Sequence, residues 1–112
     1  MKPDWEKEFP ASITVCDKEG IILEMNDKAA ASFADEGGYN LIGKNLFECH
    51  TTESVNKIKE IMSENKQNVY TIEKKGKKKL IYQTPWYENG ELKGLVELSV
   101  VIPMNMPHFV RE

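Results

Sequence analysis

The segment from Asp17 to Asn26 constrains the fold of this chain most, because it combines a tight turn between two short strands with the start of a helix. Residues 13–16 alternate with the two-residue period of a half-buried strand, and apolar residues 21, 23 and 25 repeat that period after the turn. Gly20 can adopt a positive φ angle and close the hairpin. Asn26 offers a side-chain oxygen to the free N–H groups of the segment that follows it. The sequence predicts strand, turn, strand and helix in that order.

Length and charge limit the class of protein. The 112 residues are enough for one domain with its own core, so we expect a single domain over residues 1–112. No apolar run approaches the ~20 residues of a spanning helix, and the two cysteines lack a zinc-like spacing. A formal net charge of −3 argues against nucleic acid as a partner. We expect a cytoplasmic protein with free thiols, no membrane segment and no nucleic-acid surface.

The two ends of the chain have distinct patterns. Residues 4–9 place Trp5 and Phe9 among charged residues, which predicts a short N-terminal lead-in helix within residues 1–10. Pro103 and Pro107 prevent a regular strand or helix from continuing, so residues 103–112 are expected to form an irregular C-terminal arm.

The middle of the chain is predicted to be helical. Residues 39–47 indicate a compact loop with single helical turns. Thr51 and Thr52 can cap a helix, and an apolar stripe follows at helical spacing. The stripe consists of Val55, Ile58, Ile61 and Met62.

Three strands follow, over residues 69–73, 79–87 and 92–102, with turns at Lys75-Gly76 and Asn89-Gly90. In the last strand, the face that carries Leu95 and Val101 is only partly polar and requires a cover. The element order predicts an α+β fold in which one five-stranded antiparallel sheet is covered by helices on one face. A sheet split in two is the alternative.

In this order the motifs resemble a PAS domain, a small sensor module of bacterial signalling proteins. The resemblance depends on the hairpin 17–20, Asn26, the segment 41–45, the helix from Glu53 and the segment 85–94. It implies strand order 2-1-5-4-3 and a space for a small ligand or cofactor between the inner sheet face and the middle helices. The usual closing step of signalling PAS domains is replaced here by Val101-Ile102-Pro103. We therefore expect a stand-alone sensor or a module that contacts a protein partner in trans, with the C-terminal arm as a candidate contact.

Candidate ligand-binding residues come from the middle helices and from aromatic residues of the strands, which combine apolar surface with a polar atom. Period two puts Tyr82 and Trp86 on one face and Gln83 on the other, and the sequence does not settle which face is inside. The candidates are Phe33, Leu46, Cys49, His50, Ile58, Met62, Tyr70, Tyr82 and Trp86.

Two adjacent residues suggest more specific chemistry. His50 lies near the position where some PAS domains carry a haem-ligating histidine, and imidazole is a suitable axial ligand. A surface or capping histidine is the alternative. Cys49 precedes a helix start, which favours a thiolate, although a half-buried apolar role is the ordinary one. In flavin-binding photoreceptors the photoactive cysteine follows the Gly-x-Asn element, where this chain has Leu46, so a flavin photoadduct is not expected.

No nucleophile and base stand at a catalytic spacing, so the chain is not expected to be an enzyme. The sequence favours a small-molecule sensor that forms a homodimer through the outer sheet face. The dimer candidates are Trp5, Phe9, Leu95 and Val101. A haem-binding gas or redox sensor through His50 and a ligand-free interaction module are the alternatives, and the identity of the ligand or cofactor stays open.

Overall fold

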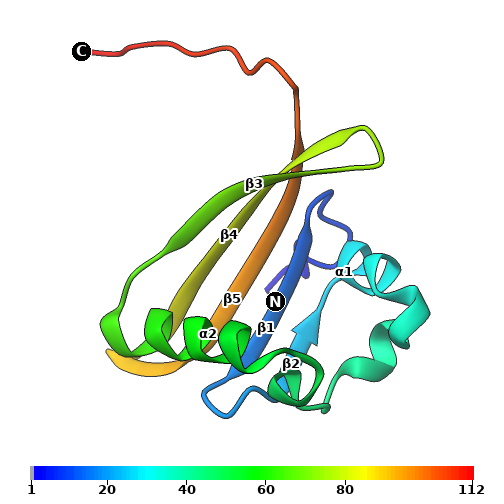
Figure 1. Ribbon diagram of the computed structural model, residues 1–112, viewed down its shortest axis with the longest axis vertical. Helices are drawn as coiled ribbons and strands as arrows, with labels where there is room; N and C mark the ends of the chain where they lie inside the picture. The colour runs from blue at the N-terminus through cyan, green and yellow to red at the C-terminus, as the bar shows by residue number, and fades with distance from the viewer. Residues whose placement is uncertain (1) are drawn as a thin grey trace.

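The computed structural model describes residues 2–112, apart from the side chain of Cys49. Its five strands form one antiparallel sheet in the order β2-β1-β5-β4-β3, which confirms the predicted topology (Figure 1). The strands are β1 (Ser12–Asp17), β2 (Ile22–Met25), β3 (Asn68–Lys74), β4 (Lys77–Glu88) and β5 (Glu91–Ile102). The helices are α1 (Asp27–Ser32), α2 (Thr52–Glu64) and three 3₁₀ turns, η1 (Ala34–Glu36), η2 (Gly38–Leu41) and η3 (Leu46–Cys49).

The β1–β2 hairpin is fixed by its first turn residue. The Asp17 Oδ1 atom accepts hydrogen bonds from the backbone N–H groups of Glu19 and Ile21, both at 2.9 Å. A register shift between Val15 and Cys16 then pairs Cys16 with Ile22. Ile22 and Met25 are buried as a result, whereas Leu23 is exposed. The expected alternation of residues 21, 23 and 25 is therefore wrong, because β2 contains one residue more than β1 across this bulge, and the extra residue changes which side chains of β2 face inward.

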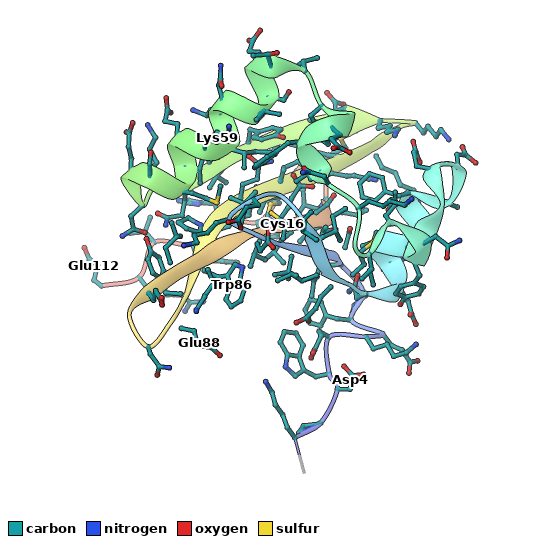
Figure 2. The ribbon with its side chains drawn as sticks, turned by 90° about the horizontal axis from the view of Figure 1, so that it is seen from below. Asp4, Cys16, Lys59, Trp86, Glu88 and Glu112 are labelled. Atoms are coloured by element: carbon teal, nitrogen blue, oxygen red, sulfur yellow. The ribbon has the colours of Figure 1, made fainter. Side chains whose placement is uncertain are left out.

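The helices lie on one face of the sheet, which we call the inner face; the opposite face is the outer face. In Figure 2, Lys59 on α2 and Trp86 on β4 lie on opposite sides of the sheet. Pairing in register places Cys16 beside Leu95 on the inner face. These two residues pack against the buried stripe of α2, which consists of Ile58, Ile61 and Met62. The core thus lies between α2 and the sheet centre.

Two of the proposed dimer residues lie on the inner side of β5. Leu95 is 3% exposed and belongs to the core, so it is not available for a dimer contact. Val101 shares its side of the strand but is 56% exposed, beyond the helices. The outer face instead carries the alternate residues of β5, Val96, Leu98 and Val100, next to Leu80 and Tyr82 of β4. We expected the outer face to mediate the dimer. The β5 residues on that face are Val96, Leu98 and Val100, not the predicted Leu95 and Val101.

The centre of the sheet requires a glycine. A Cβ atom at Gly94 would lie 1.9 Å from the carbonyl oxygen of Cys16, so no other residue fits without moving β1 from β5. The same carbonyl oxygen accepts a hydrogen bond of 3.1 Å from the indole N–H of Trp86. Trp86 therefore crosses Gly94 on the outer face and links β4 to β1.

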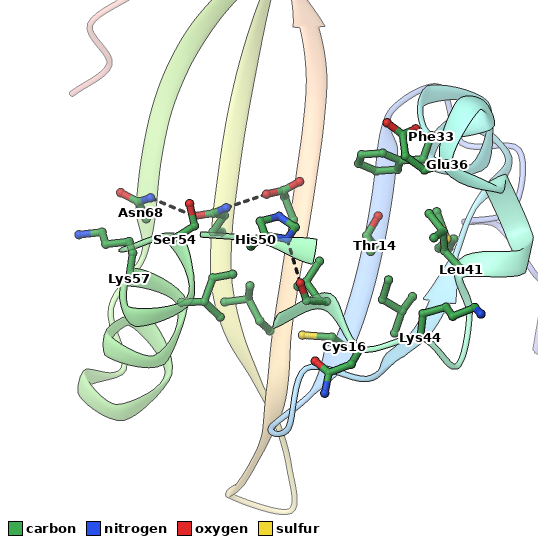
Figure 3. A pocket seen from close by; sticks show the side chains of 18 of the residues that line it. Thr14, Cys16, Phe33, Glu36, Leu41, Lys44, His50, Ser54, Lys57 and Asn68 are labelled. Carbon is green, nitrogen blue, oxygen red and sulfur yellow. Dashed lines mark hydrogen bonds between the residues drawn. The ribbon is translucent and has the colours of Figure 1, made fainter. Parts of the chain in front are cut away.

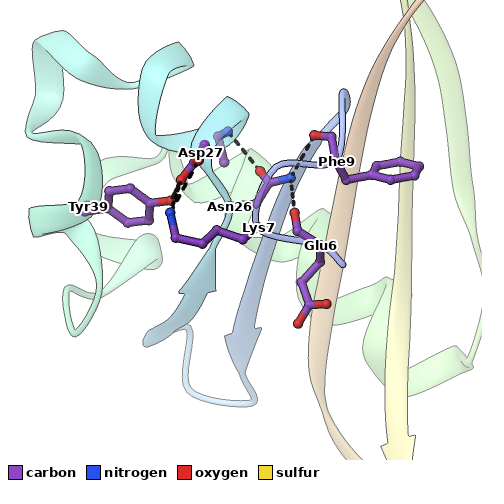
Figure 4. A network of polar contacts seen from close by, with 7 residues as sticks. Glu6, Lys7, Phe9, Asn26, Asp27 and Tyr39 are labelled. Atoms are coloured by element: carbon purple, nitrogen blue, oxygen red, sulfur yellow. Dashed lines mark hydrogen bonds and ion pairs between the residues drawn. The ribbon is translucent and has the colours of Figure 1, made fainter. Parts of the chain in front are cut away.

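The N-terminal segment forms turns over residues 5–8, and the expected lead-in helix is not present there. The Trp5 and Phe9 rings meet edge to face at 5.5 Å between centroids, and both are exposed. The backbone carbonyls of Glu6 and Phe9 accept hydrogen bonds from the Asn26 side chain (Figure 4). These long-range bonds hold the segment in place without the hydrogen bonds of a helix.

The C-terminal arm, residues 103–112, has no helix or strand and extends away from the sheet (Figure 1). Its apolar side chains, which include Met104, Met106, Phe109 and Val110, are exposed, Phe109 by 70%. None of the helices described in residues 2–112 has the length and apolar character required to cross a membrane.

Candidate functional site

A cavity of about 480 Å³ lies between the inner face, the 3₁₀ turns and α2, as Figure 3 shows. This volume is within the roughly 300–1,000 Å³ of small-molecule sites. Apolar side chains from five elements or their connections form most of the wall: Ile22, Met25, Leu41, Leu46, Ile58 and Leu95. An apolar wall of this kind favours a ligand with an apolar body.

Across the sheet floor of the cavity runs a row of polar side chains, which we call the polar row: Asn68 on β3, Gln83 on β4 and Glu97 on β5. These residues are direct cross-strand neighbours. The Asn68 Nδ2 atom donates to Gln83 Oε1 at 2.9 Å, and Gln83 Nε2 donates to Glu97 Oε2 at 2.6 Å. Thr14 of β1 continues the row, because it pairs with Glu97 and lines the cavity.

Three charged residues of the cavity lining are exposed to solvent and so lie at its opening, which we call the mouth. They are Glu36 of η1, Lys44 in the loop before η3, and Lys57 of α2. In Figure 3 the side chains of Lys44 and Lys57 extend away from the centre of the cavity.

His50 lies where η3 ends and lines the same cavity. Its Nδ1 atom is 2.9 Å from the carbonyl oxygen of Leu46. A carbonyl accepts only, so Nδ1 carries the proton, and in the neutral ring the lone pair is on Nε2. Thr51 then caps α2 by accepting a 3.1 Å hydrogen bond from the backbone N–H of Ser54, and this cap fixes the helix start beside the cavity.

Two groups on the cavity wall have shifted pKa values. Burial raises the pKa of the Cys16 thiol, so the thiol is neutral at physiological pH. Burial, together with the nearby charge of Glu97, raises the pKa of the Tyr70 phenol. Both residues therefore present neutral side chains to a bound molecule.

Five of the predicted ligand-binding residues line the cavity: Phe33, Leu46, His50, Ile58 and Tyr70. Whether they bind a ligand stays a prediction. Tyr82 and Trp86 lie on the outer face, so the expectation that they line the cavity is wrong; the alternation placed Gln83 inside instead. Met62 packs in the core beneath the cavity. The side chain of Cys49 is outside the described residues.

Sequence reasoning missed the polar row. Its three residues are 15 and 14 positions apart along the chain, so only the strand register brings them together. A partial signal did exist, because Gln83 lies between Ile81 and Pro85, and Glu97 follows Leu95, on the face that carries the core; it becomes useful only once that face is known to be the inner one. Metal chemistry has no comparable signal: within the described part of the chain, no three His, Cys, Asp or Glu side chains are grouped as metal ligands.

No protein-family model matches the chain, and no curated protein matches it. Solved structures do match. The PAS domain of the histidine kinase ThkA has a TM-score of 0.66 at 20% identity, over 80% of this chain and 97% of that one. The Aer2 receptor from Vibrio cholerae, described as a dual PAS-haem oxygen sensor, has a TM-score of 0.61 at 18% identity, over 83% and 95%.

A dimer of VqmA from Vibrio cholerae, described among LuxR-type receptors, has a TM-score of 0.70 at 13% identity, over 96% of this chain and 55% of that one. At these identities the likeness concerns the fold. The chain has the PAS fold, as its motifs predicted, and its similar structures include signalling sensor domains.

Proposed function

We propose that this PAS-fold chain is a cytoplasmic small-molecule sensor whose ligand binds between the inner face and the middle helices. The observation that supports this most is the cavity of about 480 Å³ with an apolar wall and a polar row across its floor. Apolar area supplies affinity in such sites, and a few fixed polar groups set the orientation of the ligand. A histidine kinase PAS domain and an oxygen receptor among the similar structures agree with a sensory role.

The mechanism we propose is a shift in population between two arrangements of the cavity wall. A ligand on the polar row also touches Phe33, Leu41 and Leu46, which belong to the segment of short helical turns. This segment is held by single turns rather than by a long helix. A ligand that binds one arrangement of this segment more tightly raises the population of that arrangement.

Thermal unfolding against a panel of metabolites tests ligand binding. A specific ligand at 100 times its Kd stabilises the folded state by about 2.7 kcal/mol and raises Tm by several degrees. Thr14→Phe places a ring in the cavity and is expected to abolish this rise. Thr71→Phe is the matched control, since Thr71 is an exposed strand residue that faces away from the cavity. Equal shifts in both variants would contradict binding in the cavity.

We also propose a homodimer through the outer face. The half-buried apolar residues Val96, Leu98 and Val100 form a continuous stripe there. Asp4, next to Trp5, lies on the same side of the sheet as Trp86 in Figure 2, so the Trp5–Phe9 pair can extend this surface. The exposed apolar arm 103–112 is a second candidate contact, for a protein partner in trans.

Sedimentation of three proteins tests the dimer. The unaltered chain and Val101→Lys, which changes the opposite side of β5, are expected to be dimers. Leu98→Lys puts a charge into the outer stripe and is expected to give a monomer. A monomeric unaltered chain, or dissociation by Val101→Lys alone, would reject this interface.

A haem sensor is the second candidate, and it is favoured by the orientation of His50. Metal-binding histidines commonly donate their other ring N–H to a carbonyl, as His50 does to Leu46. When bound, haem would supply gas or redox chemistry, and His50 is the residue that would hold its iron. A visible absorption band after addition of haemin, lost in His50→Ala, would support this candidate, and a colourless protein would reject it. The polar row makes an organic ligand with polar groups the better match to the floor.

A further inference from the structure

We propose that the ligand has an N–H donor group at one end of an apolar body, and that this donor binds the carboxylate of Glu97. The inference rests on the proposed function and defines the chemical class of the ligand. An amidinium, an ammonium or the N–H of a heterocycle would satisfy it, whereas a carboxylate or phosphate at the inner end would not.

The direction of the hydrogen bonds in the polar row supports this assignment. Both amide groups in the row donate toward Glu97: Asn68 donates to Gln83, and Gln83 donates to Glu97. Each of these amides thus uses one of its two N–H donors within the row. The row ends in a carboxylate, a group that only accepts when it is ionised.

The carboxylate has capacity for further donors. An ionised carboxylate offers about four lone-pair positions. Among the described residues, Gln83 is the side chain that donates to Glu97. Glu97 also lines the cavity, beside the apolar side chain of Leu95 from the same strand and face. A hydrogen bond to a charged group is stronger in such surroundings than in water.

The other charged residues of the site also favour a donor group, rather than an anion, at the inner end of the ligand. Lys44 and Lys57, which would attract an anion, extend outward at the mouth. Glu36, the other acidic residue of the lining, is an exposed residue of η1. An anionic group at the inner end would meet Glu97, so like-charge repulsion excludes it from the floor.

Three probes of nearly the same shape test the inference: benzamidine, benzamide and benzoate. They share a phenyl ring and differ in the end group, which is a cationic donor, a neutral amide or an anionic acceptor. Methyl NMR spectra of the whole chain would report binding through Leu46 and Ile58. We expect benzamidine to bind tightest and benzoate weakest, with Kd values for benzamidine of about 1–10 mM, as suits a small fragment.

Variants locate the contact. Glu97→Gln keeps the shape of the side chain and an oxygen that accepts from Gln83, but it removes the negative charge. We expect it to raise the Kd for benzamidine by about tenfold or more. Glu91→Gln, at an exposed position of the same strand, is the matched control and should leave the affinity unchanged. Glu36→Gln tests whether benzamidine binds the acidic residue at the mouth of the cavity instead of Glu97 on its floor. Loss of benzamidine binding in Glu36→Gln but not in Glu97→Gln would overturn the assignment to Glu97.

The outcomes also separate this inference from the proposed function. Benzoate binding in the cavity as tightly as benzamidine would overturn the ligand class and leave a sensor cavity in place. If none of the three probes shifts the methyl signals at about 10 mM, the assignment of the ligand class to Glu97 is overturned, whereas the proposed function is rejected only if the metabolite panel also gives no stabilisation.

Discussion

Two polar clusters in this protein differ in how completely their hydrogen bonds are satisfied. Asn26 is 3% exposed, and its side chain makes five hydrogen bonds. Its Oδ1 atom accepts from two backbone N–H groups, and the two N–H groups of Nδ2 are shared among three backbone carbonyls (Figure 4). In the polar row each amide donates one side-chain hydrogen bond toward Glu97, and the carboxylate at the end of the row retains capacity to accept.

This difference separates a structural polar residue from a candidate binding residue. Asn26 joins the N-terminal segment, β1 and α1 through groups that have no capacity left for a ligand. Gln83 is also buried, at 9% exposure, but it aligns Glu97 toward a cavity. Burial alone would rank the two residues alike; hydrogen-bonding capacity distinguishes them.

Asn26→Ala should have the largest effect on stability. It removes the cap of α1 and leaves buried backbone carbonyls and N–H groups without partners, so we expect a loss of about 3 kcal/mol in the free energy of unfolding. Urea unfolding followed by circular dichroism measures it as a lower midpoint with an unchanged slope. Asn56→Ala, at an exposed position of α2, is the control. Equal free energies of unfolding for the two variants would show that the hydrogen bonds of Asn26 do not stabilise the fold, which would contradict its structural role.

Gln83→Leu should cost less, about 1 kcal/mol or below, even though it deletes two side-chain hydrogen bonds. Leucine fills a similar volume, and Asn68 and Glu97 keep access to the cavity. The same urea experiment measures the difference. A loss as large as that of Asn26→Ala would show that the polar row is a structural network.

Glu97→Gln should change the free energy of unfolding by less than about 0.5 kcal/mol, because the bond from Gln83 can be retained. Its effect should appear on ligand binding instead. Parallel unfolding curves with and without the stabilising panel compound measure both quantities. A large decrease in the free energy of unfolding without ligand, together with an unchanged stabilisation by the ligand, would show that Glu97 is a structural residue and not a binding residue.

Asp27, beside the Asn26 cluster, should give the smallest effect. Hydrogen bonds from Tyr39 and Lys7 lower the pKa of its carboxyl from the ordinary value of 3.8. Because the pKa is lower in the folded state, the stabilisation is present above that ordinary value and is lost as pH falls through the folded value. The Tm difference between the unaltered chain and Asp27→Asn should therefore shrink between about pH 5 and pH 2. A difference that grows toward low pH would contradict this sign.

Local patterns predicted most of the fold. The hairpin turn, the Asn26 cap and the stripe on α2 depend on residues close in sequence, and each formed as expected. The strand order came from the resemblance of the ordered motifs to PAS domains. The N-terminal helix was wrong, because the segment is held by long-range bonds to Asn26 that its own sequence does not reveal.

The site was harder to predict because it depends on register. Period two separated Tyr82 from Gln83 correctly, yet both faces of β4 carry apolar residues, so the inner one could not be chosen. The aromatic residues drew attention to the wrong face. Only the pairing of β3, β4 and β5 shows that Asn68, Gln83 and Glu97 form one row.

The most direct measurement is the location of a bound small molecule, from intermolecular NOEs between the panel compound that stabilises the protein most and the methyl groups of the chain. A ligand between the inner face and the helices should show NOEs to Ile22, Leu46 and Ile58. NOEs confined to Val96, Leu98 and Val100 on the outer face would contradict the account.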